Sequence, residues 1–278
     1  MSNPAKPDDS VGPKTQLGWL NGYRSAVSLT FDDGMDCHLD PVIPILEDHN
    51  LRGTFYPIAK GNWSETETSL PYLERFRPAV ENGHEIGNHS IHHWCSCAAR
   101  LDLESSDISN HTPAGLEYRT LAELETELDQ ACQRFEAIFP EITLWSFCYP
   151  CYNTFVGRGT NRYSYVPLVA GRFFAARGGG EMSNLTNSPY HADLHCLMSW
   201  KCENRKADDL IELIQRTNRD GGGWNIFTFH GVGGGHLSIE QAEFEALCHY
   251  LQREKDTVWI APLVEVALQL HQWRQQGN

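Results

Sequence analysis

The sequence has no long apolar run and few basic residues, and both deficits exclude classes of protein. None of its apolar segments approaches the ~20 residues that a helix needs to cross a bilayer, and the first residues contain no basic segment followed by an apolar one. The chain has 22 Lys and Arg against 36 Asp and Glu among 278 residues, a net charge of -14. Such a chain repels phosphate backbones and anionic lipid surfaces. We therefore expect a cytoplasmic protein that binds neither nucleic acid nor a membrane; its oligomeric state is not indicated.

The nine cysteines do not form the pattern of a disulfide-rich protein. Their number is odd, and they are scattered over a chain long enough to bury a sizeable core, so we expect mostly reduced thiols. Cys148 and Cys151 form a C-x-x-C pair, a spacing also found in redox centres and, with further cysteines such as Cys95 and Cys97, in zinc sites. Because Tyr-Pro separates the pair within a predicted turn, we interpret the spacing as coincidental.

After a polar lead at residues 1–22, strand-like and helix-like patterns alternate over residues 23–275, as in a single α/β domain. The predicted strands are Ser25–Phe31, Gly53–Ile58, Leu144–Tyr149, Arg172–Ala176, Leu194–Met198, Trp224–Phe229 and Val258–Ile260. The predicted helices are Leu39–His49, Leu73–Asn82, Leu121–Phe139, Asp208–Arg216, Ile239–Leu251 and Pro262 to Trp273. This alternation predicts a mainly parallel sheet, with chemistry in the loops at the C-terminal ends of the strands. Residues 94–117, rich in Ser, Asp and Asn, break the pattern, and we interpret them as an insertion beside the site.

An acidic pair follows the first predicted strand. The apolar segment Ser25–Phe31 leads directly into Asp32, Asp33 and Gly34. Adjacent residues on a strand point to opposite sides, but at a strand end Gly34 permits a turn that brings both carboxylates toward one pocket. One carboxylate can then bind a metal while its neighbour accepts a proton. A solvated turn is the alternative for Asp-Asp-Gly taken alone.

The densest chemical signal is the segment His89-Ser90-Ile91-His92-His93. His89 and His93 are four residues apart and can share one face of a helical turn, as a chelating pair requires. Hydrolytic zinc sites usually have three protein ligands and an open position for water, so the pair needs a third donor, for which Asp33 is the candidate. A polar surface loop is the alternative.

A further histidine follows another apolar strand. His230 comes directly after Trp224–Phe229 and is expected at the same end of the sheet as the acidic pair. A lone histidine is more often structural. Together, however, the acidic pair, the histidine pair and His230 predict a metal-dependent hydrolase.

Two of these segments resemble the ordered motifs of the polysaccharide deacetylases, the NodB homology family also called carbohydrate esterase family four. Thr30-Phe31-Asp32-Asp33-Gly34 matches the first motif, and His89, Ser90 and His93 match the second, H-[ST]-x-x-H. The resemblance implies that Asp32 is the general base and that Asp33, His89 and His93 bind the metal. It covers about Ala26 to Ala261 and implies an α/β fold, a distorted (β/α) barrel of about seven parallel strands.

The remaining motifs of that family are degenerate here. In Cys148-Tyr149-Pro150-Cys151-Tyr152, a cysteine stands where the family has the arginine that orients the base, and we expect the backbone amide of Tyr149 or Tyr152 to contribute to an oxyanion hole. The fourth motif has no clear counterpart, so Arg177 is the candidate that orients the base instead, and Trp200 a candidate wall of the pocket. Thr228-Phe229-His230 resembles the last motif and implies that His230 is the general acid.

The resemblance thus implies a metal-dependent deacetylase that removes N- or O-linked acetyl groups from a polysaccharide or oligosaccharide. The expected cofactor is a divalent metal, Zn²⁺ first and Co²⁺ or Ni²⁺ as alternatives, and the expected partner is an acetylated carbohydrate. Two other functions stay open: hydrolysis of a non-sugar amide, as in relatives that act on allantoin-type or cyclic imide substrates, and a catalytically silent carbohydrate-binding protein. The sequence does not distinguish chitin-type, peptidoglycan and xylan substrates.

Overall fold

The computed structural model describes residues 19–59, 69–96, 115–179 and 185–276. Most of the predicted insertion at 94–117 therefore lies outside the described residues. Trp19 and Leu20, which the sequence analysis placed in the N-terminal lead, are buried against the last helix, α9 (Leu263–Gln275), so these two residues pack with the domain. In the part of the chain that is described, no helix is long and apolar enough to span a bilayer.

The larger sheet is built around β1 (Ser25–Asp33), all nine residues of which are buried. It pairs in parallel with three strands, β2 (Thr54–Pro57), β9 (Trp224–Phe229) and β10 (Val258–Ile260). Next to β2 lies β3 (Glu85–Ile86), and next to β9 lies β8 (Trp200–Lys201), both also parallel. The apolar residues of β1 fit this position because a strand flanked on both sides and covered on both faces has no contact with water.

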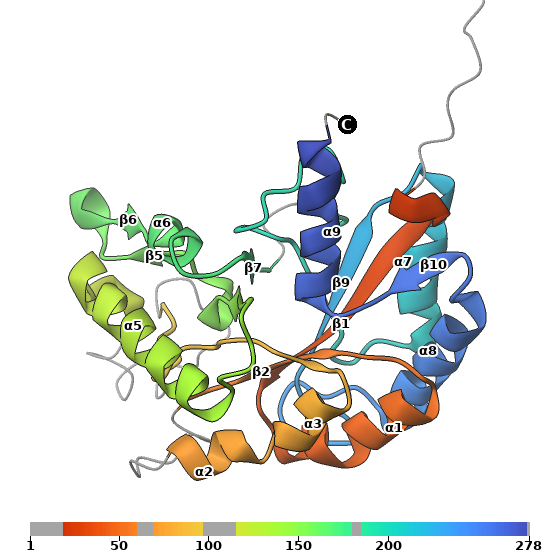
Figure 1. Ribbon diagram of the computed structural model, residues 1–278, viewed down its shortest axis with the longest axis horizontal. Coiled ribbons are helices and arrows are strands. Elements are labelled where there is room, and N and C mark those ends of the chain that lie inside the picture. The colour runs from red at the N-terminus through yellow and green to blue at the C-terminus, as the bar shows by residue number, and fades with distance from the viewer. Residues whose placement is uncertain (1–18, 60–68, 97–114, 180–184, 277–278) are drawn as a thin grey trace, which may run out of the picture.

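A second sheet completes the barrel. It consists of the parallel strands β4 (Ser146–Cys148) and β7 (Ala175–Arg177). Isolated parallel bridges join it to both edges of the larger sheet, Asn88 to Phe147 beside β3, and Arg177 to Leu197 just before β8. Seven parallel strands, β1, β2, β3, β4, β7, β8 and β9, thus follow one another around a distorted (β/α) barrel, which confirms the predicted fold class. Figure 1 shows β9 and β10 on either side of β1.

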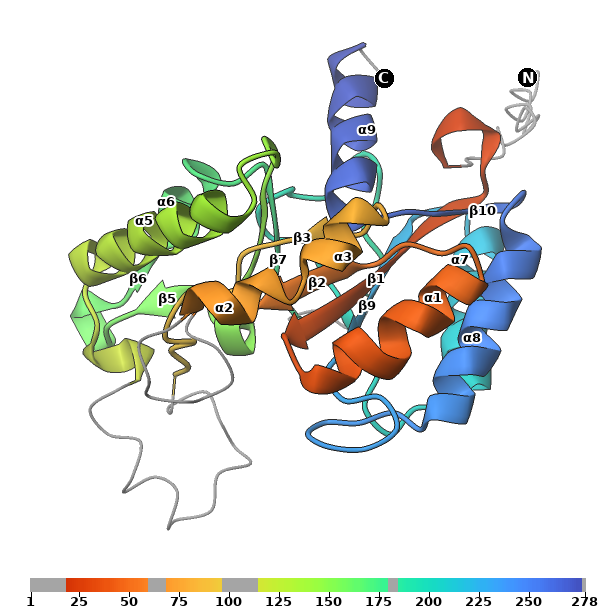
Figure 2. The ribbon, with the colours of Figure 1, turned by 60° about the horizontal axis from the view of Figure 1, so that its bottom comes forward.

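Helices lie around the barrel strands, most of them at the positions in the chain where the sequence predicts a helix. Figure 2 shows α8 (Gln241–Glu254) next to α1 (Ile43–Asp48), α7 (Ala207–Arg219) behind α8, and α5 (Leu121–Ile138) at the other end of the molecule. A capping box between Thr120 and Glu123 fixes the start of α5. The predicted helix at Leu73–Asn82 is divided into α2 (Ser69–Glu74) and α3 (Arg77–Glu81), and the predicted strand at Leu194–Met198 forms only the bridge at Leu197.

Several short elements were not predicted from the sequence. They follow β4 along the chain. They are the 3-10 turn Pro150–Tyr152, β5 (Phe155–Val156), the 3-10 turn Gly159–Asn161, β6 (Tyr163–Ser164) and α6 (Val166–Ala170). Strands of two residues have too few positions to show an alternation of apolar and polar side chains.

Candidate active site

The predicted site residues meet at one end of the barrel because each lies at or just beyond the C-terminal end of a parallel strand. These residues and their strands are Asp32 and Asp33 at the end of β1, His89 and His93 after β3, Cys148 at the end of β4, Arg177 at the end of β7 and His230 after β9. The barrel therefore brings together residues that are up to 198 positions apart in the sequence, from Asp32 to His230.

Asp33, His89 and His93 form a compact set of donor atoms. Asp33 Oδ1 lies 3.4 Å from His89 Nε2 and 3.3 Å from His93 Nε2. It is buried and has no hydrogen-bond partner among the described residues. Two donors bound at 2.0–2.1 Å to a tetrahedral zinc ion lie about 3.4 Å apart. The spacing and the unpaired buried oxygen therefore fit a divalent cation held by these three side chains.

The histidines are prepared for metal binding through their other atoms. His89 Nδ1 lies 2.8 Å from the Cys148 carbonyl oxygen, so Nδ1 carries the proton and Nε2 faces Asp33. Burial and the neighbouring His89 lower the pKa of His93 to about 4, which leaves this imidazole neutral at pH 7. Burial also acts to lower the pKa of His89, but Cys148 and Asp33 raise it, and a bound cation would displace this proton.

His89 and His93 lie on an irregular loop with left-handed residues and not on the predicted helical turn. Ser90 and His93 have left-handed backbone conformations, with φ of 62° and 49°, and Asp33 has φ of 73°. The Asn88 side chain accepts a hydrogen bond from the Ser90 amide, and the Ser90 hydroxyl accepts one from the His93 amide. Non-glycine residues in this conformation are costly and cluster at functional sites.

Glu127 also supports this loop, although the sequence analysis did not single it out. Its carboxylate accepts hydrogen bonds from the amides of Ile91 and His92 at 2.8 and 2.7 Å, and it lies 2.7 Å from His92 Nδ1. The sequence feature that could have indicated Glu127 is its place on the apolar face of α5, where it lies at helical spacing between Leu124 and Ala131.

Asp32 pairs with Arg177, whose side chain is fully buried. The guanidinium Nη2 donates to Asp32 Oδ1 and lies 2.9 Å from Cys148 Sγ, while Nη1 donates to the Ser199 hydroxyl at 3.4 Å. Burial acts to raise the pKa of Asp32, but Arg177, His89 and His230 outweigh it and hold the pKa below its ordinary value. Asp32 is thus an ionised carboxylate with a fixed orientation.

The position of Arg177 explains the cysteine in the degenerate motif. Cys148 and Arg177 are register partners on the paired strands β4 and β7. A cation that reaches Asp32 from β7 therefore occupies the space into which a long side chain at position 148 would extend. The small Cys148 leaves room for it and donates its thiol toward Asp32 Oδ2 at 3.5 Å.

His230 lies across Asp32 from Arg177. Its Nε2 is 4.0 Å from Asp32 Oδ2, and its side chain is 13% exposed, so it is accessible from outside. Its backbone carbonyl accepts a hydrogen bond from the buried His38 Nε2 at 2.8 Å, which fixes the start of the loop after β9. Within the described residues, His230 Nδ1 is buried without a hydrogen-bond partner.

The structure does not bring the remaining candidates to the site in the predicted way. The Tyr149 amide donates to the Arg177 carbonyl and the Tyr152 amide to the Tyr149 carbonyl, so neither is free for an oxyanion hole. Trp200 donates its indole N–H to Asn225 and lies under Arg216 of α7, in the core. Side chains alternate along a strand, so Ser199 is the residue that points to Arg177.

Cys95 and Cys151 form a disulfide, which the sequence analysis did not predict. As expected for most of the cysteines, Cys37, Cys132, Cys148, Cys202 and Cys248 are free thiols, and Cys97 lies outside the described residues. The disulfide joins the segment after His93 to the turn after β4. It also removes Cys95 and Cys151 as thiolate ligands for a second zinc ion.

Comparisons with known proteins agree with this geometry. Residues 21–154 match the family model described as polysaccharide deacetylase. The chain is 31% identical over 95 residues to a peptidoglycan-N-acetylglucosamine deacetylase of Bacillus cereus, covering 31% of this chain and 32% of that protein. It is 36% identical over 56 residues to the uncharacterized protein YlxY of Bacillus subtilis, covering 20% of this chain and 15% of that protein. The matched segments therefore span a third or less of either relative.

Solved structures share the fold. A crystal structure assigned as a polysaccharide deacetylase from Mycobacterium smegmatis superimposes with a TM-score of 0.60 at 15% identity, covering 93% of this chain and 94% of that one. A mutant of a CE4 family pseudoenzyme superimposes with a TM-score of 0.50 at 13% identity, covering 87% of this chain and 67% of that one. At these identities the likeness concerns the fold alone. Residues 21–154, the segment that matches the polysaccharide deacetylase family model, carry Asp32, Asp33, His89 and His93.

Proposed function

We propose that the chain is a metal-dependent hydrolase that removes acetyl groups from a carbohydrate. One observation carries the proposal: the unpaired oxygen of Asp33 faces two histidine nitrogens beside a second carboxylate, Asp32, that is held ionised by a buried arginine. Such a site separates two tasks, because one carboxylate is available for a cation and the other for a proton.

Asp33, His89 and His93 would hold the cation, Zn²⁺ first and Co²⁺ or Ni²⁺ as alternatives. Three protein ligands leave a position open, as in hydrolytic zinc sites. When bound, the cation supplies a Lewis acid for the acyl oxygen and lowers the pKa of water from 15.7 toward about 7.

Asp32 acts in this proposal as the general base. Its ionised carboxylate accepts the proton of the attacking water, and Arg177 keeps the accepting oxygen in place. His230, on the other side of Asp32 and partly exposed, donates a proton to the departing amine or alcohol.

A backbone amide at the turn after β4 stabilises the oxyanion in this account. Since the amides of Tyr149 and Tyr152 already donate, the donor is Cys151, for whose amide the structure records no acceptor among the described residues. Its side chain lies within 4.8 Å of His93, so the residue borders the metal ligands. A preorganised N–H group near the developing charge is a major source of catalysis in acyl transfer.

The substrate class rests on the family and its named relative. The Bacillus cereus relative is described as a peptidoglycan-N-acetylglucosamine deacetylase, which supports an N-acetylated sugar as the substrate of this chain. We therefore place an N-acetylated oligosaccharide before O-acetylated ones.

Release of acetate from N- and O-acetylated oligosaccharides tests the proposal, with metal-stripped and zinc-loaded protein compared side by side. We expect acetate only from the loaded protein. Asp32→Asn should bind zinc at full stoichiometry and release none, whereas His89→Ala should lose both. Stoichiometric zinc without acetate from any substrate would contradict deacetylation; allantoin-type amides and sugar binding would then be assayed in turn.

A further inference from the structure

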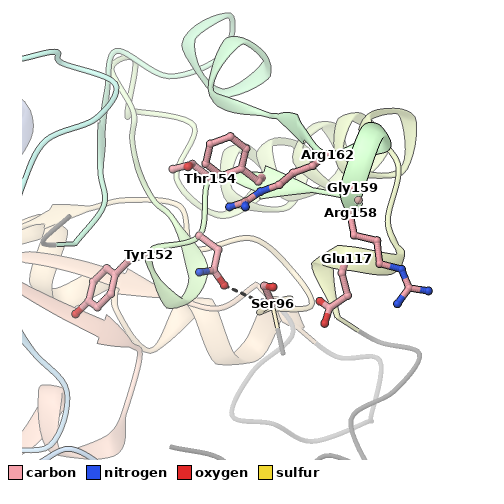
Figure 3. A pocket seen from close by; sticks show the side chains of 10 residues that line it. Ser96, Glu117, Tyr152, Thr154, Arg158, Gly159 and Arg162 are labelled. Carbon is pink, nitrogen blue, oxygen red and sulfur yellow. Dashed lines mark hydrogen bonds between the residues drawn. The ribbon is translucent and has the colours of Figure 1, made fainter. Parts of the chain in front are cut away.

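A cavity of about 260 Å³ adjoins the candidate active site. Its walls come from the short elements after β4, around the turn Pro150–Tyr152 and the β5–β6 hairpin, together with Ser96 and Glu117 (Figure 3). Of these elements, the turn Pro150–Tyr152 contributes the Cys151 amide to the proposed chemistry, but Cys151 is not one of the residues that line the cavity. The cavity is therefore a separate feature of the surface beside the metal ligands.

The wall of this cavity is continuous with the active site. Tyr152 lines the cavity, and its ring lies 5.9 Å from the guanidinium carbon of Arg177, the partner of Asp32. Ser96 lines it from the other side, with its amide donating to the Asn153 side chain at 2.8 Å. The disulfide between Cys95 and Cys151 joins these two segments. A ligand that reaches the metal ligands from this side thus passes over the cavity.

Two arginines contribute positive charge to the described wall of the cavity. Arg158 lies over the Tyr118 ring at 4.9 Å, and Arg162 lies over the Phe155 ring at 4.4 Å. In the described part of the chain, no carboxylate forms an ion pair with either guanidinium. Both arginines are exposed. Stacking on a ring fixes the orientation of the planar guanidinium and leaves its N–H edges available for a carboxylate.

The sign of the charge on this wall is opposite to that of the protein as a whole. The whole protein carries a net charge of -14, yet the described residues that line the cavity include two arginines against one acid, Glu117. Among the described lining residues the balance is therefore one positive charge, which suits a monoanion such as a carboxylate better than a phosphate with two charges. Phe155, which lines the cavity, is 40% exposed, and Tyr118, over whose ring Arg158 lies, is 42% exposed; both add apolar surface next to the charge.

We propose that this cavity binds a carboxylate-bearing sugar unit of the substrate, next to the unit that loses its acetyl group. The inference rests on the proposed function and narrows its substrate class to acidic oligosaccharides. Arg158 and Arg162 bind the carboxylate through their N–H edges, and the exposed rings contact the apolar face of the sugar.

The test compares two N-acetylated oligosaccharides of equal length, one with its carboxylate intact and one with that group reduced to an alcohol. For zinc-loaded protein we expect a KM about tenfold or more lower for the acidic substrate, as charge-assisted hydrogen bonds imply. In the double variant R158Q/R162Q the ratio of the two KM values should fall to about one. Arg253→Gln, an exposed arginine on α8, is the control and should keep the preference.

Equal KM values for wild-type protein, or a preference that survives R158Q/R162Q, would overturn the proposal. Zinc content and circular dichroism of each variant check that it is folded. If no substrate releases acetate, the proposed function fails by itself, and calorimetric binding of the same two oligosaccharides still tests the cavity. Tighter binding of the acidic one, lost in R158Q/R162Q, would then support the subsite, and equal binding would overturn it.

Discussion

The candidate active site has two halves that are built differently. The metal half, Asp33, His89 and His93, comes from two short segments whose residues are close in the sequence. The base half, Asp32, Cys148 and Arg177, takes one residue from each of three strands. The comparison indicates that metal binding depends on residues at fixed spacing, whereas the orientation of Asp32 depends on a cation that different strands can supply.

Removal of a metal ligand should have the largest effect. In His89→Ala, we expect zinc content to fall to near zero and acetate release to fall by at least about 10³-fold, because several kcal/mol of charge stabilisation are lost with the cation. Metal analysis and the acetate assay measure both quantities. His191→Ala, an exposed histidine outside the site, is the matched control. Full activity without zinc would contradict the role of the metal half.

Arg177→Met should separate the two halves. It leaves the Asp32 carboxylate buried without its cation, a change that costs about 3–5 kcal/mol of unfolding free energy for a buried pair. We expect zinc to bind at full stoichiometry while acetate release falls strongly. Urea unfolding, metal analysis and the acetate assay cover these three readouts, and wild-type turnover would show that Arg177 does not position the base.

Removal of the Cys95–Cys151 disulfide should loosen the contact between the halves. The two cysteines are 56 residues apart, and a cross-link of that span typically contributes about 2–4 kcal/mol to the unfolding free energy. The double variant C95S/C151S should therefore melt at a lower temperature than the wild type, and a dithiol should no longer change its melting. Cys132→Ser, a free cysteine on α5, is the control and should respond to the dithiol like the wild type.

Glu127→Gln should have the smallest effect, a loss of about 1–3 kcal/mol of unfolding free energy. The glutamine side chain keeps an oxygen that can accept from the amides of Ile91 and His92, but it lacks the negative charge of the carboxylate. Burial acts to raise the pKa of Glu127, but hydrogen bonds from His92 and Ile91 lower it below 4.5. A carboxylate whose pKa is lower in the folded than in the unfolded protein stabilises the folded protein at a pH above its unfolded pKa. This stabilisation is lost as the pH falls through the folded pKa.

The difference between wild type and Glu127→Gln should thus be full at pH 7 and shrink below about pH 4.5. Urea unfolding over this range measures it. Glu136→Gln, an exposed acid on the same helix, should show no such difference. A gap that persists unchanged at low pH would contradict the charged role of Glu127.

The sequence allowed the parallel fold and the proximity of the metal half to be predicted, because periodic segments and short spacings are local signals. The base half and its neighbours depend on strand register, which a sequence does not fix. A shift of one position decides that Ser199, and not Trp200, contacts Arg177. The hairpin β5–β6 was missed for a similar reason, since its strands of two residues carry no pattern.

The most direct measurement exchanges the two register partners of the base half. Cys148→Arg with Arg177→Cys returns the cation to β4, where the resemblance to the family places it. We expect each single substitution to lose most of the zinc-dependent acetate release, and the double variant to release acetate at least about tenfold faster than either single one. The claim is that Asp32 requires a guanidinium beside it, whichever strand carries the arginine. A double variant no more active than Arg177→Cys would contradict this claim.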